Sequence, residues 1–409
     1  MAQALRFWIR APHLSAAVVA LLLASALTWL LFDRLHIERR LAFVTASEML
    51  TVKDQGIALQ KQAFENPRLL PAYGSSEFAN DFSWDGRLFF ARFPTGFELF
   101  TVGKAGSTPL ITAERLAALG DAVRGRKVVV VLSPTWFIAR NPNPNAYAGN
   151  FSALQAGKLA FESPISLPLK REFARAMLGF PKTLDGHPLL RLELEHLASP
   201  GSSLEDRVIE AAGRSETDFL LALDHLQTVF ALPDDAMKKP PKAHHSRPEP
   251  DWQALETRAA TSLERISFEA VLDGEKSERA EAADKFYHSF QGPRRTFARV
   301  MNRSGEWQHL EILLKTLHEL GARPLLLNIP ANAKAFEKAG VSASDLEAYY
   351  TRLENEVRPY GCPLVTLKSD QEDPAFFLDT MGHPSAKGWV KLNEVIDEFY
   401  HDTLPAKLE

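Results

Sequence analysis

A short, uninterrupted apolar run limits the possible folds of this chain more than any other feature. Residues 127–134 read "KVVVVLSP", with four consecutive valines followed by a leucine. Such a run is typical of a strand that is buried on both faces, as in a parallel sheet covered by helices on each side. A second apolar run, "RPLLLNIP", occupies residues 323–330. The two runs therefore predict an α/β fold built on a parallel sheet.

Segments with helical spacing of apolar residues alternate with these strands, as an α/β fold requires. The expected helices cover residues 111–123, 305–321, 342–361 and 385–403, and further short strands cover residues 68–73 and 362–367. Thr112 is the expected N-cap of the first helix, and Ser342 and Asp345 are the expected capping residues of the third. Residues 67–150 and 301–409 therefore form the two parts of one α/β domain.

The region between these two parts, residues 151–300, has few strand signals and reads as a helical insertion. Within it, residues 233–250 contain five prolines, which prevent a regular helix or strand. We expect this stretch to be an exposed linker.

The N-terminal segment contains 19 residues without a charge, from Leu14 to Phe32. At about 1.5 Å per residue, a helix of this length nearly spans a hydrocarbon core about 30 Å thick. The alternative is a cleaved signal peptide, since residues 24–26 resemble a cleavage site. The apolar run continues beyond that site, which favours an uncleaved transmembrane anchor at residues 1–36, followed by a polar stalk at 37–66. Arginines flank the segment in nearly equal number, so the charge rule favours an exported body only slightly.

The composition excludes several classes of function. A formal net charge of −4 argues against a nucleic-acid-binding protein, which is usually strongly basic on one face. Cys362 is the only cysteine, so no disulfide can form within the chain. Neither a C-x-x-C nor an H-E-x-x-H pattern occurs, and we expect no metal site and no cofactor.

A serine pair follows the predicted strand at residues 68–73, in the sequence Gly74-Ser75-Ser76-Glu77. Open α/β sheets bind their ligands at the carboxyl ends of the strands. A helix that starts at such a turn presents N–H groups that stabilise negative charge. Acyl transfer through a serine needs an exposed hydroxyl, donors for the oxyanion and a base. The alternative is that Ser75 or Ser76 merely caps a helix.

A candidate base lies near the C-terminus, where His383 follows Asp379 by four residues and precedes the last predicted helix. A carboxylate that binds one ring nitrogen keeps a histidine in the tautomer that can accept a proton at the other nitrogen. Asp379 and His383 could therefore act together from a single loop. The alternative is an ordinary surface or capping histidine ahead of Pro384.

Several segments, in this order, together carry a resemblance to a known family. They are the N-terminal apolar span, "GSSEF", "KVVVVLSPTWF", "NFSALQ", "SGEWQHLEILLKTLHELGARPLLLNIPANAK" and "EDPAFFLDTMGHPSAKGW". With these segments the chain resembles the DltD family of teichoic-acid D-alanylation, within the SGNH (GDSL-like) hydrolase superfamily. The resemblance covers nearly the whole chain and implies an SGNH-like parallel sheet flanked by helices.

The resemblance also implies roles for individual residues. It assigns the nucleophile to Ser76 rather than Ser75, and the remaining triad members to His383 and Asp379. The family usually has two residues between this aspartate and histidine, whereas the present chain has three, and Gly382 could absorb the extra residue as a bulge.

The oxyanion glycine and asparagine of the superfamily are not obvious in this sequence. Gly74, Ser75 and Asn332 are the candidate binding or oxyanion residues. The backbone N–H of Ser76 is a better candidate donor than any side chain. Asn332 could equally be a loop asparagine that ends the strand at residues 323–330.

The function implied by the resemblance is that of a single-pass membrane protein whose catalytic domain lies outside the cytoplasmic membrane. It would work beside a membrane-bound O-acyltransferase of the DltB type. The D-alanyl group would pass from a carrier or other acyl donor to a cell-envelope polymer.

Two alternatives remain open at this stage. One is an O-acetyl esterase or acetyltransferase of an exported polysaccharide. The other is a non-catalytic scaffold for the acyltransferase or the carrier protein, which the extra residue in the Asp–His loop favours.

Overall fold

The computed structural model describes residues 16–24, 26–27, 41–78, 83–199, 204–230, 250–261, 288, 290, 296–379 and 382–405. Within these residues, five strands form a parallel sheet in the order β2-β1-β3-β4-β5. The strands are β1 (Leu69–Gly74), β2 (Glu98–Gly103), β3 (Lys127–Leu132), β4 (Arg323–Asn328) and β5 (Leu364–Val365). The predicted parallel α/β sheet is confirmed.

The apolar runs at residues 127–134 and 323–330 form β3 and β4, which are direct neighbours. Successive β3 side chains point to opposite faces of the sheet. Val128 and Val130 belong to the core on one face, and Val129 and Val131 belong to the core on the other. Both faces are covered, which explains why the run contains no polar residue.

The other strands differ more from the prediction. β5 is shorter than the expected strand at residues 362–367, since it pairs with β4 only at Leu364 and Val365. β2 is absent from the predicted strands, because its sequence "ELFTVG" includes Glu98 and Thr101, two polar residues that are nevertheless buried.

Helices cover both faces of the sheet. The larger core includes residues of α4 (Ala58–Glu65), α6 (Pro109–Leu119), α9 (Leu167–Leu178), α17 (Glu306–Glu319), α18 (Ala333–Lys338) and α19 (Ala343–Val357). The smaller core includes residues of α5 (Gly86–Arg92), α13 (Trp252–Ala260) and α20 (Ala386–His401). The C-terminal helix α20 therefore lies on the opposite face of the sheet from α6 and α17.

The helix starts test the predicted caps. Ser342 and Asp345 form the expected capping box at the start of α19. The prediction for Thr112 is wrong, because α6 begins at Pro109 with Thr108 at the N-cap, and Thr112 is buried inside the helix. Proline at the first helical position has the backbone angle that a helix start requires.

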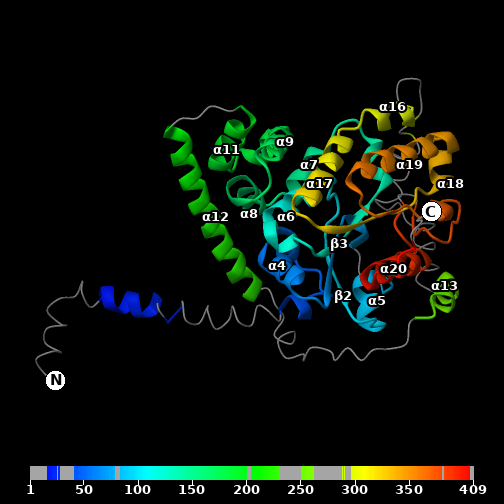
Figure 1. The fold of residues 1–409 in the computed structure, drawn as a ribbon, viewed down its shortest axis with the longest axis horizontal. Helices are drawn as coiled ribbons and strands as arrows, with labels where there is room; N and C mark the ends of the chain where they lie inside the picture. Colours follow the sequence, from blue (N-terminus) through cyan, green and yellow to red (C-terminus); the bar gives the residue numbers. More distant parts are fainter. Residues whose placement is uncertain are drawn as a thin grey trace, which may run out of the picture.

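The region expected to be a helical insertion is helical where the structure describes it. Its helices are α8 (Ala153–Gly157), α10 (Pro181–Leu184), α11 (Pro188–Ala198) and α12 (Leu204–Phe230), in addition to α9 and α13. Three further short helices are α3 (Thr51–Gln55), α7 (Pro144–Asn150) and α16 (Phe297–Asn302). α12 runs along one side of the molecule, next to α8 and α11 (Figure 1).

Residues 41–66 do not form the polar stalk that we expected. Leu41, Phe43, Leu59 and Phe64 are each at most 5% exposed and belong to the larger core. Their apolar side chains pack beside β1, so this segment is part of the domain.

Two further predictions fall largely outside the described residues. Of the predicted span from Leu14 to Phe32, only residues 16–24 and 26–27 are described, and these are helical. Among the residues that the structure describes, no helix combines the length and the apolar character needed to cross a membrane. Residues 233–249 of the proline-rich stretch also lie outside the described residues.

Candidate active site

The serine pair lies at the carboxyl edge of the sheet, immediately after β1. Ser76 begins a short 3-10 turn, Ser76–Phe78, and is half-buried, whereas Ser75 is buried. A side chain at position 74 would collide with the Glu77 carboxylate and the Phe78 ring, so Gly74 permits this tight turn. Gly74 therefore has a packing role and is not among the residues that line the pocket.

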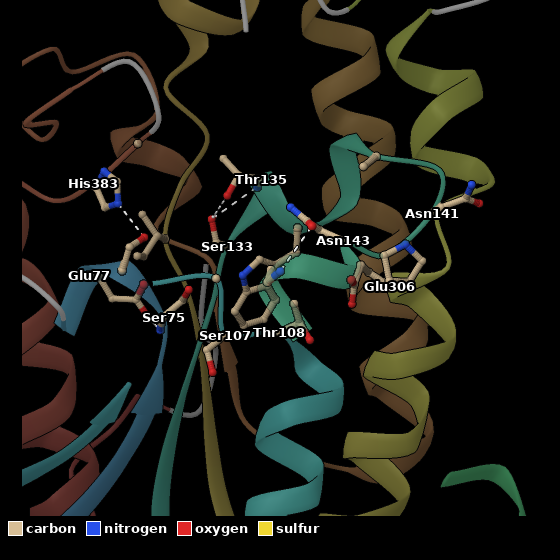
Figure 2. A pocket seen from close by; sticks show the side chains of 18 residues that line it. Ser75, Glu77, Ser107, Thr108, Ser133, Thr135, Asn141, Asn143, Glu306 and His383 are labelled. Atoms are coloured by element: carbon tan, nitrogen blue, oxygen red, sulfur yellow. Dashed lines mark hydrogen bonds between the residues drawn. The ribbon is translucent and has the colours of Figure 1, made fainter. Parts of the chain in front are cut away.

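The structure brings the three predicted triad residues into one hydrogen-bonded chain. The Ser76 hydroxyl oxygen lies 2.8 Å from Nε2 of His383. Nδ1 of the same ring lies 2.7 Å from Oδ2 of Asp379 (Figure 2 shows His383 at one side of the pocket). The predicted proximity is present, and the catalytic roles of the three residues stay predictions.

The loop that holds Asp379 and His383 closes on itself. Phe377 and Pro384 form an isolated antiparallel bridge, and the Leu378 N–H donates to the His383 carbonyl at 2.7 Å. Oδ1 of Asp379 also accepts the backbone N–H of His383 at 3.2 Å. Gly382 has a φ of +89°, which residues other than glycine rarely adopt. The extra residue between aspartate and histidine is therefore accommodated without separating the two side chains.

Asn332 does not lie in the pocket, which corrects its expected place. Its Oδ1 accepts the Ala335 N–H at 3.2 Å and caps α18, so this oxygen is already used. Its Nδ2 donates to the backbone carbonyl of Asp379 at 3.3 Å. Asn332 therefore holds the Asp379 loop through a hydrogen bond from outside the pocket. The alternative prediction, a loop asparagine after β4, fits this position better than an oxyanion role does.

Ser75 and Glu77 are coupled on either side of the candidate nucleophile. The Ser75 N–H donates to Oε1 of Glu77 at 2.6 Å. Burial raises the pKa of the Glu77 carboxyl, and the Ser75 N–H and the nearby His383 only partly offset this effect. Because the Ser75 N–H already has an acceptor, it does not serve as an oxyanion donor in this conformation.

A pocket of about 310 Å³ opens beside the Ser76 hydroxyl. Hydroxyl and amide side chains are frequent among the residues that line it, which include Ser75, Ser76, Ser107, Thr108, Ser133, Thr135, Asn141 and Asn143. Glu77, Glu306 and His383 also line it, together with the indole of Trp136. No lysine or arginine lines this pocket in the described part of the chain. Nor do the described residues contain a group of three or more side chains able to hold a metal ion.

Most of these lining residues are absent from the predicted site, among them Glu77, Ser133, Thr135 and Glu306. Glu77 stands next to Ser76 in the sequence, and Ser133 lies at the carboxyl end of the apolar run at residues 127–134. Both positions carried a usable signal, because strand ends are where α/β sheets place ligands. Glu306 is buried at the start of α17 and pairs with His309, and no local pattern marks it.

Comparisons with known proteins agree on one family. A family model described as "DltD protein" matches residues 46–401. The chain is 29% identical to Protein DltD of Bacillus subtilis (strain 168) over 352 residues, which cover 85% of this chain and 86% of the relative. It is 24% identical to Protein DltD of Staphylococcus aureus (strain NCTC 8325 / PS 47) over 345 residues, which cover 84% of this chain and 83% of the relative. It is 22% identical to Protein DltD of Lacticaseibacillus rhamnosus over 406 residues, which cover 96% of this chain and 92% of the relative.

Proposed function

The chain belongs to the DltD family, whose members are involved in the D-alanylation of teichoic acids, and from this premise we propose that it is a serine acyl-transfer enzyme acting on D-alanyl esters. The observation that carries the proposal is the hydrogen-bonded chain from Ser76 through His383 to Asp379. A hydroxyl, a base and a carboxylate in this order are the parts that nucleophilic acyl transfer needs.

In the first step, the Ser76 oxygen attacks the carbonyl carbon of the D-alanyl donor and its proton passes to Nε2 of His383. The carbonyl π electrons move to the carbonyl oxygen, which becomes an oxyanion. Asp379 accepts the Nδ1–H of the imidazolium at 2.7 Å and stabilises its positive charge. The tetrahedral intermediate then loses its leaving group, which takes the proton from His383.

In the second step, the acceptor attacks the D-alanyl ester on Ser76. His383 takes the proton of an acceptor hydroxyl, a second tetrahedral intermediate forms, and the bond to the Ser76 oxygen breaks. His383 returns the proton to that oxygen, and the free hydroxyl is restored. When the acceptor is a polymer hydroxyl the result is transfer, and when it is water the result is hydrolysis.

The cellular setting is part of the proposal. The uncharged run from Leu14 to Phe32 supports a single-pass anchor. The family suggests that the catalytic domain lies outside the cytoplasmic membrane. A membrane-bound O-acyltransferase and a D-alanyl carrier are the partners that the family suggests, and a cell-envelope polymer is the acceptor.

The test compares a variant that lacks the Ser76 hydroxyl with one that lacks the hydroxyl of its neighbour, Ser75. The full chain and its Ser76→Ala and Ser75→Ala variants are purified and assayed for release of D-alanine from a D-alanyl glycerol ester. We expect Ser76→Ala to lose at least about 10³-fold in kcat with an unchanged melting temperature. Ser75→Ala keeps its backbone bond to Glu77 and should retain most of the activity.

A fluorophosphonate probe gives a second readout, since it should label the wild type and Ser75→Ala but not Ser76→Ala. Retained turnover in folded Ser76→Ala protein would defeat the nucleophile assignment. Normal polymer alanylation in a Ser76→Ala strain, with none in a deletion strain, would instead favour a scaffold.

A further inference from the structure

Ser133 lies beside the candidate nucleophile because of the order of the strands. β1 and β3 are neighbours, with Ala72 opposite Val129 and Tyr73 opposite Val130. The carboxyl ends of these two parallel strands therefore lie side by side at one edge of the sheet. Ser133 directly follows β3, Ser76 is the second residue after β1, and both line the same pocket. Ser133 therefore lies at the same edge of the sheet as Ser76 and faces the same pocket.

The hydrogen bonds of Ser133 leave its hydroxyl proton available to the pocket. A serine hydroxyl has one proton to donate and two lone pairs that accept. One lone pair accepts the Thr135 N–H at 3.3 Å. The Thr135 hydroxyl lies 2.7 Å from the Ser133 oxygen, and either group can be the donor. When Thr135 donates, both lone pairs of Ser133 are used and its O–H must find its acceptor elsewhere.

Once substrate is bound, its carbonyl oxygen is an acceptor for the Ser133 hydroxyl proton, and the pocket offers few competing donors. Figure 2 shows Ser133 and Thr135 on the pocket wall across from His383, with the Ser133–Thr135 bonds drawn as dashed lines. The Ser75 N–H is already bound to Glu77, and Asn332 lies outside the pocket. No lysine or arginine lines the pocket in the described residues. A hydroxyl is therefore the polar side chain available next to Ser76 on the β3 side.

We propose that Ser133 is an oxyanion donor, and that Thr135 positions it. The oxygen of the tetrahedral intermediate accepts the Ser133 O–H, while the Thr135 hydroxyl donates into the remaining lone pair of Ser133. Before substrate binds, the Ser133 O–H can rest on Thr135, so no buried donor is left unpaired. This inference rests on the proposed acyl transfer through Ser76.

A purely structural role makes a different prediction. Ser133 also caps the short 3-10 turn Pro134–Ile138, and loss of a cap lowers the stability of the fold. A cap affects folding but does not distinguish the ground state from the transition state. An oxyanion donor contributes mainly in the transition state, so its loss lowers kcat about 10²–10³-fold and changes KM little.

The experiment compares wild type, Ser76→Ala, Ser133→Ala, Thr135→Val and Thr135→Ser as full chains. D-alanyl glycerol ester is the substrate, and methylboronic acid is the probe of the tetrahedral adduct on Ser76. Ser342→Ala is the matched capping control, since Ser342 caps α19 through its hydroxyl but does not line the pocket. We expect Ser133→Ala to lose about 10²–10³-fold in kcat and a similar factor in boronate affinity. Ser342→Ala should lose stability only.

The Thr135 variants keep the proposal testable if Ser133→Ala does not fold. Thr135→Val keeps the shape but not the hydroxyl and should lose about 10-fold in kcat, whereas Thr135→Ser should stay near wild type. A Ser133→Ala protein that folds, keeps kcat within about threefold and binds boronate normally would overturn the inference. Turnover in Ser76→Ala would instead overturn the proposed function, so the two failures are distinguishable.

Discussion

The Ser76 hydroxyl oxygen lies 2.8 Å from Nε2 of His383, although 307 positions separate the two residues. The packing of α20 on the sheet produces this proximity. The Phe78 ring stacks on Trp389 of α20 at a centroid distance of 5.9 Å, and Nδ2 of Asn393 donates to the Trp84 carbonyl at 3.0 Å. The position of the base relative to the nucleophile therefore depends on the C-terminal helix.

The carboxylate of Asp379 should be needed for the rate and not for the fold. In Asp379→Asn the side chain can still bond to the loop, but an amide no longer stabilises the imidazolium or fixes the same tautomer. We expect kcat for a D-alanyl ester to fall by about 10²–10⁴ with little change in KM. Steady-state kinetics and circular dichroism check this, and a kcat within about threefold of wild type would exclude Asp379 from the triad.

The left-handed backbone at Gly382 should be required for the geometry of the base. Gly382→Ala has room for a Cβ, since the nearest atom is the Pro330 carbonyl oxygen at 3.8 Å. Its cost is therefore the backbone strain of a φ of +89°, about 1–2 kcal/mol. We expect lower stability together with a clear loss of kcat, because His383 is the next residue.

Gly361→Ala is the matched control for Gly382. Gly361 also has a left-handed φ, of +62°, and it has open space where a Cβ would lie and no place in the pocket. The Gly361→Ala variant should lose about as much stability as Gly382→Ala but keep the kcat of the wild type. Equal kinetic losses in both variants would show that the effect at Gly382 is not local.

Removal of the Glu77 side chain should leave a buried donor unpaired. In Glu77→Ala the Ser75 N–H loses its 2.6 Å acceptor, and an unsatisfied buried donor costs about 1–3 kcal/mol. In Glu77→Gln an amide oxygen can still accept this N–H. Urea unfolding at neutral pH should show Glu77→Ala clearly destabilised and Glu77→Gln close to wild type. Equal stability of the two variants would contradict a structural role for this hydrogen bond.

The buried carboxyl of Glu114 should make stability depend on pH. Burial raises the pKa of Glu114 from 4.5 to about 8, although the Tyr147 hydroxyl donates to it at 2.9 Å. Between these values the folded chain holds a proton that the unfolded chain has lost. This group therefore lowers the free energy of unfolding as pH rises, by at most about 1.4 kcal/mol per pH unit. The loss is complete above the folded pKa.

The measurement compares wild type with Glu114→Gln by urea unfolding at pH 5, 6, 7 and 8. The wild type should lose stability relative to the variant as pH rises. Parallel curves for the two proteins would show that Glu114 ionises in the folded state much as it does in the unfolded state.

The features that could be predicted from the sequence are those that local pattern determines. The burial of β3 is visible in its consecutive valines. Asp379 and His383 are close in the sequence, so their pairing is visible there too. Asn332 was misplaced because a polar residue after a strand can face the pocket or cap the next helix, and only tertiary structure decides between these.

The relation of Ser133 to Ser76 could not be predicted for a different reason. It depends on β1 and β3 being neighbours, with β2 placed outside them. Strand order follows from the packing of the whole domain, so no window of sequence around either serine contains it. The burial of residues 41–66 was missed in the same way, since their partners lie in other elements.

The bridge between Phe377 and Pro384 closes the loop that carries both Asp379 and His383, whereas Ser76 lies on a different part of the chain. The hydrogen bonds of this pair join residues that are close in the sequence, whereas the Ser76–His383 contact joins residues 307 positions apart. The hydroxyl and its base are therefore within reach of each other only when the whole domain is folded.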